Sequence, residues 1–565
     1  MSVLRAGSYV SCTVKKNDRG RGDLMRVTFV ALGWEQLGVS LLSAIAKQHG
    51  HQVDLAFSAA LFNDRYNLSI PALASYFDDR KDVLSAIKRQ NPDVLAFSAL
   101  TGTYQWMLDI AREVKRTRPD VKVIFGGVHA SAVPERVLAQ PQVDYVCVGE
   151  ADAAFPLILK AIEQGAPAAP IVNTRYKLSN GEVVRGPQTG FVQDLDSLPI
   201  FDKSLWEDHI CVDDWYLTMA SRGCPYRCTF CFNNFFARLP EQKAGKYVRQ
   251  RSVGHMMREL RLAKRRYKLR FLEFEDDVFT VDKKWLKEFL FCYKREIGVP
   301  FQCLTHPKYM DDEIARWLAQ AGCRYVQMGI QSMDEEYKYA TIKRYEKNED
   351  VERAMEAMRK YNIRVKVDHM FGLPGEPLEA QEAAHKLYVK YPPYRIQTFW
   401  TNFLPGTHMV AQAKTMGLIT DEEIERLNDG TDFDFYRRST KAGDPQKVKF
   451  YKAYEVFFKL FPVLPQFVRQ RMHPKLFLRW PAWLCSLTSF MADALIGLVS
   501  RNPDHITYAK HYLYHVRRSV LGRMGWKIPA PTRLRKDNIA APGAGVTDEK
   551  STGICVPEDV LVQTR

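Results

Sequence analysis

The sequence has few cysteines for its length, and most of them stand alone. Of its 565 residues, 11 are cysteine, too few and too scattered for a disulfide framework in a chain of this size. Isolated cysteines are typical of a protein in the reducing cytoplasm; here they are Cys12, Cys147, Cys211, Cys292, Cys303, Cys323, Cys485 and Cys555. The remaining three are crowded into one short segment, which indicates a metal centre.

The beginning of the sequence contains no apolar stretch of the kind that a secretion signal requires. Residues 1–24 are polar and basic, so we expect a flexible extension of a cytoplasmic protein. Residues 480–499 are a hydrophobic run of about 20 positions, the length that spans a bilayer. Because Asp493 and a proline near the start interrupt this run, we expect a buried or membrane-surface helix in preference to a membrane span.

Acidic residues are fewer than basic ones, 65 against 81, which gives a formal net charge of +16. This excess favours anionic partners such as nucleotide-bearing cofactors or acidic lipids without choosing among them, and we expect no nucleic-acid partner. The hydrophobic share of 46% and the charged share of 26% are ordinary for a globular protein. The length predicts two or three domains.

The order of apolar runs predicts an α/β protein with several domains. Strands alternate with helices over residues 25–165, which favours a Rossmann-like parallel sheet covered on both faces, and residues 166–205 are expected to be a linker. A second alternation over 206–405, with up to six strands, predicts a partial or complete (β/α) barrel. Residues 406–527 are expected to form a helical domain, and residues 528–565 a disordered tail.

The crowded cysteines are Cys224, Cys228 and Cys231, in the segment SRGCPYRCTFCFNN after a predicted strand. Three thiolates on one loop can hold three corners of a cubane iron–sulfur cluster, which leaves the fourth iron open to a chelating small molecule. The alternative is a structural zinc site with Cys211 or His209 as the fourth ligand, although zinc knuckles usually carry two C-x-x-C pairs and no second pair is present.

The C-x-x-x-C-x-x-C spacing, with Phe230 before the last cysteine, resembles the signature of radical S-adenosylmethionine (SAM) enzymes. The resemblance implies a [4Fe–4S] cluster whose open iron is chelated by SAM. An electron, supplied by a donor such as flavodoxin or ferredoxin, then cleaves SAM to methionine and a 5′-deoxyadenosyl radical that abstracts hydrogen. It also implies that Phe230 packs near the adenine.

Three acids, Glu275, Asp276 and Asp277, end the second predicted barrel strand. They repel one another unless they meet a cation or hydrogen-bond donors. Their position resembles the one that contacts the SAM amino group in the family, which implies Glu275 and Asp277 as SAM-binding residues. A solvated loop or a helix N-cap is the alternative.

Two further segments resemble SAM-binding positions of the family. Gly329 and Gln331 end another predicted strand, where relatives often carry G-x-E-S with a side chain that reaches the ribose. Glutamine keeps the hydrogen bond without the charge. The turn FGLPGE, residues 371–376, is expected near the adenine, although Gly-Leu-Pro-Gly is also a common turn.

Small residues end three strands of the first predicted sheet in a way that resembles cobalamin-binding domains. Such residues let the nucleotide tail of the corrin pass between strand ends and helices. The elements are an S-x-L segment, a Gly-Gly pair and a Gly-Glu pair, and the cobalamin contacts that they imply, with one glycine after the first strand, are Gly38, Ser98, Leu100, Gly126, Gly127, Gly149 and Glu150.

One element of that pattern is missing. Many cobalamin domains carry D-x-H-x-x-G after the first strand, and here residues 33–38 read GWEQLG, so only Gly38 remains. The resemblance then implies cobalt without a histidine ligand, as in radical enzymes of this type. A degenerate domain that binds no corrin is the alternative.

The resemblance covers residues 25–405 and implies a cobalamin-dependent radical SAM methyltransferase. Its substrate would be an unactivated carbon or phosphorus centre of a small molecule, lipid or natural product, which offers no nucleophile until hydrogen abstraction creates a reactive centre. One alternative is an anaerobic oxidative cyclase related to tetrapyrrole ring-forming enzymes. The other, from a different class, is a non-catalytic cobalamin or redox sensor.

The C-terminal region leaves the substrate open. Residues 480–499, with the basic neighbours Arg517, Arg518 and Arg523, are expected to cap the barrel as packed helices with a solvated basic face. Contact with a lipid or a membrane surface is the alternative. No residue is identified as a general acid or base.

Overall fold

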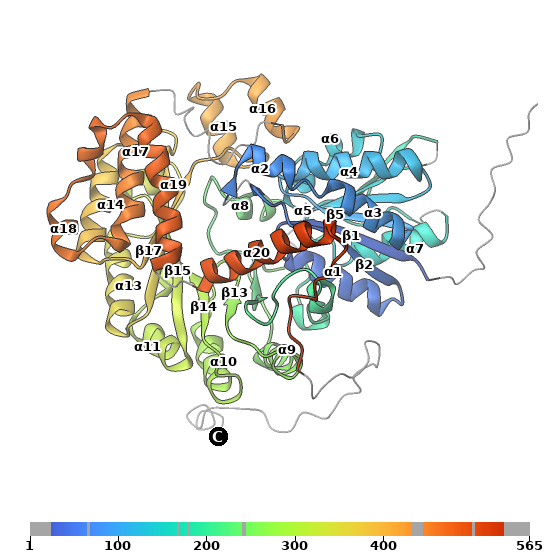
Figure 1. Cartoon of the computed structure of the whole chain (residues 1–565), viewed down its shortest axis with the longest axis horizontal. Helices are drawn as coiled ribbons and strands as arrows, with labels where there is room; N and C mark the ends of the chain where they lie inside the picture. Colours follow the sequence, from blue (N-terminus) through green and yellow to red (C-terminus); the bar gives the residue numbers. More distant parts are fainter. Residues whose placement is uncertain are drawn as a thin grey trace, which may run out of the picture.

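The computed structural model describes residues 24–64, 68–165, 169–178, 180–239, 245–431, 445–499 and 503–535. Figure 1 shows two sheets side by side, with helices packed around each. The predicted N-terminal extension lies outside the described residues except for Leu24, and so does most of the predicted C-terminal tail.

The first sheet has seven strands in the order β2-β1-β5-β6-β7-β8-β9. The first five in this order are parallel, whereas β8 and β9 pair antiparallel and come from the predicted linker. This arrangement confirms the Rossmann-like prediction. The strands are β1 (Arg26–Leu32), β2 (Gln52–Ser58), β5 (Val94–Ser98), β6 (Lys122–Gly126), β7 (Tyr145–Cys147), β8 (Thr174–Lys177) and β9 (Val183–Arg185).

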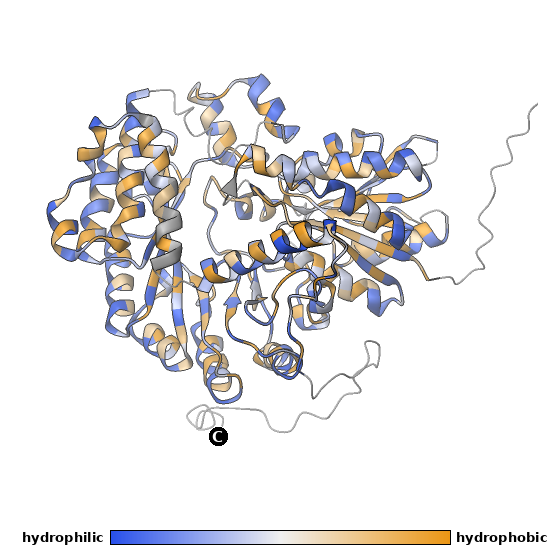
Figure 2. Cartoon of the chain, in the orientation of Figure 1, coloured by the Kyte–Doolittle hydropathy of each residue, from blue (hydrophilic) through white to orange (hydrophobic). Residues whose placement is uncertain are grey.

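Helices cover both faces of this sheet because each one buries a single apolar stripe. In the helix Tyr104–Thr117 the buried stripe includes Met107, Ile110 and Val114. Figure 2 shows the orange strands between helices that carry much of their blue on the outside. The helices are α1 (Leu37–Gln48), α2 (Pro71–Tyr76), α3 (Arg80–Gln90), α4 (Tyr104–Thr117), α5 (Gly127–Ala132), α6 (Pro134–Ala139) and α7 (Ala154–Glu163), with a short hairpin of β3 (Asn63–Asp64) and β4 (Leu68–Ser69).

The second sheet has six parallel strands in the order β10-β13-β14-β15-β16-β17. Since β10 and β17 are its two edges, the barrel is open on one side, and the predicted partial (β/α)6 barrel is confirmed. The strands are β10 (Tyr216–Thr218), β13 (Leu272–Phe274), β14 (Phe301–Thr305), β15 (Cys323–Gln331), β16 (Arg364–Phe371) and β17 (Arg395–Trp400).

The barrel helices lie between these strands in the chain, and a small hairpin and a short helix follow β10. The helices are α8 (Phe232–Phe236), α9 (Val253–Arg266), α10 (Lys283–Glu296), α11 (Asp312–Ala321), α12 (Glu335–Ala340), α13 (Asn348–Lys360) and α14 (Glu379–Lys390), and the hairpin is β11 (Ser221–Arg222) with β12 (Arg249–Gln250).

Helices dominate the C-terminal part, as predicted. The helix α17 packs on β17 and on α19, and it buries Tyr451, Phe457 and Phe458. Among the described residues, no helix has the length and hydrophobicity needed to cross a membrane. The helices are α15 (His408–Thr415), α16 (Asp421–Asn428), α17 (Pro445–Leu460), α18 (Gln466–Arg471), α19 (Ala482–Val499) and α20 (Pro503–Arg523).

The helix α20 contacts both sheets' domains, and Figure 1 shows it in red crossing between them. At the first domain, the backbone N–H of Phe62 donates to the Tyr512 hydroxyl at 3.3 Å. Near the barrel, Lys510 pairs with Asp214 at 2.6 Å, and Asp504 contacts Lys366 of β16. Beyond the helix, inside the predicted tail, Thr532 hydrogen-bonds the carbonyl of Ile210, so the start of that segment is packed on the barrel domain.

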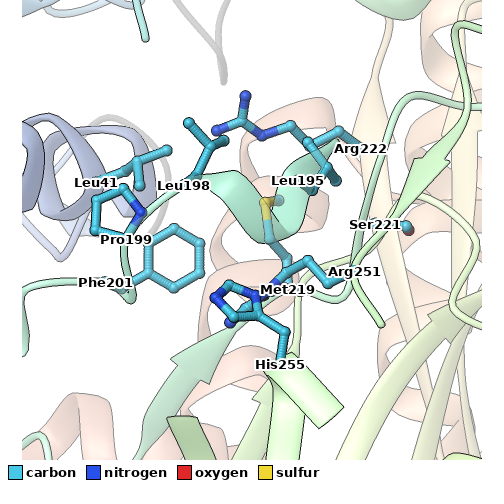
Figure 3. Close-up of a pocket in the computed structure, with 10 residues that line it drawn as sticks. All are labelled: Leu41, Leu195, Leu198, Pro199, Phe201, Met219, Ser221, Arg222, Arg251 and His255. Carbon is cyan, nitrogen blue, oxygen red and sulfur yellow. Dashed lines mark hydrogen bonds between the residues drawn. The ribbon is translucent and has the colours of Figure 1, made fainter. Parts of the chain in front are cut away.

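Ion pairs join the two domains near the ends of β7 and β11. Arg222 pairs with Asp152 at 2.6 Å and with Glu150 at 3.2 Å, and Arg249 pairs with Glu150 at 2.8 Å. Beside this junction a small cavity of about 20 Å³ lies under Arg222. Figure 3 shows the linker side chains Leu195, Leu198, Pro199 and Phe201 around it, between Leu41 of α1 and Met219 after β10.

We expect the variant Asp152→Asn to lower the free energy of unfolding by up to about 3 kcal/mol, because it leaves the largely buried Arg222 guanidinium with one carboxylate instead of two. Urea unfolding followed by circular dichroism measures the change. The exposed pair Arg118–Asp120 supplies the control: Asp120→Asn should cost less than about 1 kcal/mol. Equal effects of the two variants would contradict a structural role for this junction.

Candidate functional site

The three crowded cysteines lie on the loop between β11 and α8, beyond the carboxyl end of β10. This is the end of a (β/α) barrel where chemistry takes place. All three are free thiols, with Cys228 buried and Cys224 and Cys231 half-buried. Gly223, at the start of the loop, has φ +85°, and a Cβ there would meet the carbonyl oxygen of Tyr247, so the chain can turn in this way only at glycine.

The surroundings of the cysteines disfavour bare thiolates. Burial raises the pKa of Cys224 to about 12 and of Cys231 to about 11. Burial also raises the pKa of Cys228, although the neighbouring Arg344 opposes that shift. Thiols with raised pKa values become thiolates when cations bind them, and the irons of a cluster supply such cations.

Asn233 connects the cysteine loop to the acids at the end of β13. Its backbone N–H donates to Cys231 Sγ at 3.4 Å, and its side-chain amide donates to Asp277 at 2.8 Å. Its side-chain oxygen, Oδ1, accepts a hydrogen bond from the Tyr247 hydroxyl at 2.6 Å. The structure thus connects Asp277 to the cysteine loop through Asn233, which Tyr247 supports, and the SAM-binding role of Asp277 stays a prediction.

The geometry does not support the zinc alternative. His209 and Cys211 precede β10, whereas the cysteine loop follows it, so they lie toward the opposite end of that strand. In the described ranges, no three His, Cys, Asp or Glu side chains converge closely enough to hold one metal ion. A cubane has no such requirement, because each thiolate binds a different iron.

The other two acids after β13 have different environments. Asp276 is fully buried and accepts hydrogen bonds from the backbone N–H of Ala220 at 3.0 Å and from the Ser221 hydroxyl, so it fixes the chain that leads into the cysteine loop. Glu275 faces a cavity inside the barrel. Neither residue caps a helix: the N-cap of α10 is Asp282, so the helix N-cap alternative is wrong.

A network of buried charges lies beside Cys228, and no sequence motif pointed to it. Arg344 donates to Glu346 at 2.8 Å and to the carbonyl oxygen of Gly329 at 2.6 Å. Glu346 also pairs with His306 at 3.2 Å. Because Arg344 contacts the backbone of a predicted SAM-binding residue and lies near a cysteine, it ties β15 to the cysteine loop.

Gln331 has a backbone conformation that a non-glycine residue rarely adopts. Its φ is +65°, and the pairing of β15 with β16 shifts between Gly329 and Gln331. Its Oε1 is buried with no hydrogen-bond partner in the part of the chain that the structure describes. A strained residue with an unpaired buried acceptor is typical of a ligand site.

Phe230 packs in a separate apolar cluster with Leu373 of the FGLPGE turn. Tyr337, Ile342 and Met409 complete the buried part of this cluster. The Tyr337 hydroxyl donates to the carbonyl oxygen of Pro374 at 2.8 Å, which holds the turn in place. The structure therefore brings together the two segments that the resemblance places near the adenine.

A cavity of about 430 Å³ opens at the carboxyl end of the first sheet and faces the barrel. Six of the seven predicted cobalamin residues line it: Gly38, Ser98, Gly126, Gly127, Gly149 and Glu150. Its inner part is an apolar slot between the sheet and the helices α1 and α7, formed by Phe29, Leu42, Ala96, Ile124 and Phe155. Its outer part reaches Asn233 and Asp277 beside the cysteine loop.

Two glycines at these strand ends have backbone conformations that other residues rarely adopt. Gly127 has φ +90°, and a Cβ there would lie 2.7 Å from the backbone N and O of Ala99. Gly149 has φ +82°. The glycines allow close turns at these strand ends, and the apolar slot beneath them fits the nucleotide tail of a corrin.

Two of the predicted cobalamin-binding residues make other contacts than the remaining five. Leu100 is 38% exposed and lines a neighbouring cavity of about 740 Å³ together with Trp34 and Glu35. The carboxylate of Glu150 is engaged by Arg249 and Arg222. Its side chain thus joins the domains, and the backbone of this loop is left to face the cavity.

The GWEQLG loop has its own set of contacts. Glu35, which replaces the histidine of D-x-H-x-x-G, is buried and pairs with Lys203 at 2.5 Å and with the Ser40 hydroxyl at 2.9 Å. No histidine therefore occupies this position. The side chain found here instead is a carboxylate that is already paired within the protein.

Two family models match the chain, and each covers most of the strands of one sheet. Residues 26–159 match the B12 binding domain, and residues 219–387 match the Radical SAM superfamily. An uncharacterized methyltransferase of Pyrococcus horikoshii is 25% identical over 66% of this chain and 80% of its own length. The anaerobic magnesium-protoporphyrin IX monomethyl ester cyclase of Rubrivivax gelatinosus is 24% identical over 63% of this chain and 62% of its own length.

Among solved structures, the fold is similar to the cobalamin-dependent S-adenosylmethionine radical enzyme OxsB with aqua-cobalamin and S-adenosylmethionine bound. The TM-score is 0.59 at 13% identity, over 89% of this chain and 80% of that one. The matched models meet at the cavity between the sheets, where the glycine-rich strand ends face the cysteine loop. The chain therefore belongs to the radical SAM enzymes that carry a B12-binding domain and use a [4Fe–4S] cluster, SAM and cobalamin as cofactors.

Proposed function

We propose that this protein is a methyltransferase that acts on an unactivated carbon or phosphorus centre of a small molecule. Cys224, Cys228 and Cys231 would hold the cluster. Glu275, Asp277, Gly329 and Gln331 would bind SAM beside Phe230, and the slot under Ser98, Gly126, Gly127 and Gly149 would hold the tail of cobalamin. A flavodoxin or ferredoxin in the cytoplasm is the proposed electron donor.

One observation carries the proposal: a single cavity connects the glycine-rich end of the first sheet with Asn233 and Asp277. Methyl transfer to an unactivated centre needs a radical source and a methyl carrier that face the same substrate. Asn233 is hydrogen-bonded to Cys231 and Asp277, so that wall of the cavity belongs to the cysteine loop.

When bound, the cluster and SAM supply a hydrogen-abstracting radical and cobalamin supplies a methyl group. The chain's own residues position these groups and exclude water. Asp276 fixes the approach to the cysteine loop, and Arg344 links that loop to β15. The Arg222 and Arg249 pairs hold the two domains at a fixed distance, which near-attack geometry requires.

The test is anaerobic turnover with SAM that carries a deuterated methyl group, in the presence of a cell extract. We expect 5′-deoxyadenosine together with a product that gains one labelled methyl group. Mass spectrometry identifies both. A product without the label would contradict methyl transfer and would favour the oxidative cyclase, an alternative that the similarity to the Rubrivivax cyclase keeps open.

The sensor alternative makes a different prediction in the same experiment. A protein that only binds cobalamin has no use for SAM cleavage. If the reduced, fully loaded protein forms no 5′-deoxyadenosine with or without extract, the sensor is favoured and the enzyme proposal fails.

A further inference from the structure

The barrel contains a second cavity of about 400 Å³, and Glu275 is the one proposed SAM-binding residue in its lining. Side chains of β13, β14, β15 and β17 form its walls, and α20 covers the open side of the barrel. Trp34, from the loop after β1, reaches into it from the other domain, and Trp215 lies at its base. Trp215 stacks on Phe271 with 4.7 Å between ring centroids, so the cavity has an aromatic floor.

The walls above this floor are polar. A (β/α) barrel is normally filled by layers of branched aliphatic side chains. Here the inward positions of three neighbouring strands carry Glu273, Gln302 and Gln327. Polar side chains in a protein interior cost free energy unless each finds a partner, so their presence around an open volume points to a polar ligand.

Part of this polar wall is satisfied within the chain. Glu273 accepts from the Trp215 indole N–H at 2.6 Å and from the Gln302 amide. The Gln302 carbonyl accepts from Lys366 Nζ at 2.6 Å, and Lys366 contacts Asp504 of α20. These bonds fix the orientation of Glu273 before any ligand arrives, which reduces the entropy lost on binding.

Another part lacks partners. Gln397 Oε1 has no hydrogen-bond partner among the described residues. Burial, together with the nearby Glu275, raises the pKa of Glu273. Glu273 is buried and Glu275 is exposed toward the cavity, and the cost of ionising two neighbouring carboxyl groups would fall if a cationic group entered the cavity.

The lining of the cavity includes residues from both domains. Glu275 is two residues from Asp277, which hydrogen-bonds Asn233 beside the cysteine loop. Trp34 lines both this cavity and the 740 Å³ cavity at the carboxyl edge of the cobalamin-binding sheet. A molecule bound here therefore contacts the segment that leads to Asp277 through Glu275 and the cobalamin-binding domain through Trp34.

We infer that this cavity binds the substrate, and that the substrate is a hydrophilic molecule with a basic amine. The inference rests on the proposed function and adds the substrate class. Glu273, Glu275 and Asp504 face the cavity, with Arg395 as the opposing guanidinium. The carboxylates can bind an ammonium group of the substrate. The glutamines and Arg395 can donate hydrogen bonds to its hydroxyl or carbonyl groups. A hydrocarbon or a terpenoid without polar groups offers none of these partners.

The test measures binding of three probes to the full chain loaded with cluster and cobalamin. Glucosamine and glucose differ chiefly by an ammonium in place of a hydroxyl, and cyclohexanol is an apolar control. By anaerobic calorimetry we expect glucosamine to bind at least tenfold more tightly than glucose. In Glu273→Gln this preference should fall at least tenfold. The surface variant Glu313→Gln, on α11, should keep it.

The wild-type comparison stands even if Glu273→Gln fails to fold. Equal binding of glucosamine and glucose, tighter binding of cyclohexanol, or no saturable binding of any probe would overturn the inference. The proposed function is judged separately by 5′-deoxyadenosine formation and methyl labelling in cell extract. A labelled product that partitions into the organic phase would leave methyl transfer intact and reject the amine-bearing substrate.

Discussion

Replacing Cys228 by serine is expected to remove the iron–sulfur cluster and to abolish SAM cleavage. Cys228 is the most enclosed of the three cysteines and lies next to Arg344, so a serine there leaves one corner of the cubane without a thiolate. Loss of a group outside the first coordination sphere typically lowers metal affinity or activity about 10- to 100-fold, so loss of a ligand should lower them further. Iron and sulfide content, visible absorption and 5′-deoxyadenosine formation measure the effect.

The matched control for this variant is Cys485→Ser. Cys485 is also a buried free thiol, but it lies on α19 in the C-terminal helices. The Cys485→Ser variant should keep the full iron content and form 5′-deoxyadenosine at the wild-type rate. If Cys228→Ser retained a reducible cluster with unchanged 5′-deoxyadenosine formation, the assignment of the three cysteines would be wrong.

The second large effect is expected from Gly127→Val, which should abolish cobalamin binding. A Cβ at this position would lie 2.7 Å from the backbone of Ala99, and the φ of +90° is unfavourable for any side chain. Such strain costs about 1–3 kcal/mol, and relieving the clash would displace the strand ends that line the slot. We expect at least a tenfold loss of affinity, measured by equilibrium dialysis with cobalamin absorbance.

Gly522→Ala is the control for this variant, because nothing lies within 4 Å of a Cβ at that position in α20. The cluster should load normally in both proteins, since the cysteine loop belongs to the other domain. Circular dichroism verifies that Gly127→Val is folded. A folded Gly127→Val protein that binds cobalamin as tightly as the wild type would exclude the slot as the site of the nucleotide tail.

Local patterns were sufficient to predict the two sheets. The alternation of strands and helices is short-range, and five parallel strands of the first sheet and six of the second follow it. The cysteine loop is also local, because its three residues follow one strand. Gly126 and Gly127 were also predictable from local sequence, because a turn that excludes a side chain requires glycine at that position.

Features built from distant segments were not predictable in this way. The strands β8 and β9 lie in a segment with turn-like composition, and they are strands because they pair with β7. Arg344 acts on Gly329 and near Cys228 across a loop with no recognisable motif. Glu150 was expected at cobalamin, but its carboxylate binds Arg249, and no spacing rule relates two residues 99 positions apart.

The position of α20 has a consequence for the order in which the molecule is completed. The last barrel strand ends at Trp400, and the helix that covers the barrel's open side starts at Pro503. During translation both cofactor-bearing sheets leave the ribosome before this helix does. We therefore expect a nascent chain stalled ahead of Pro503 to admit cobalamin faster than the finished protein, with release of the cofactor slowed once the helix has docked.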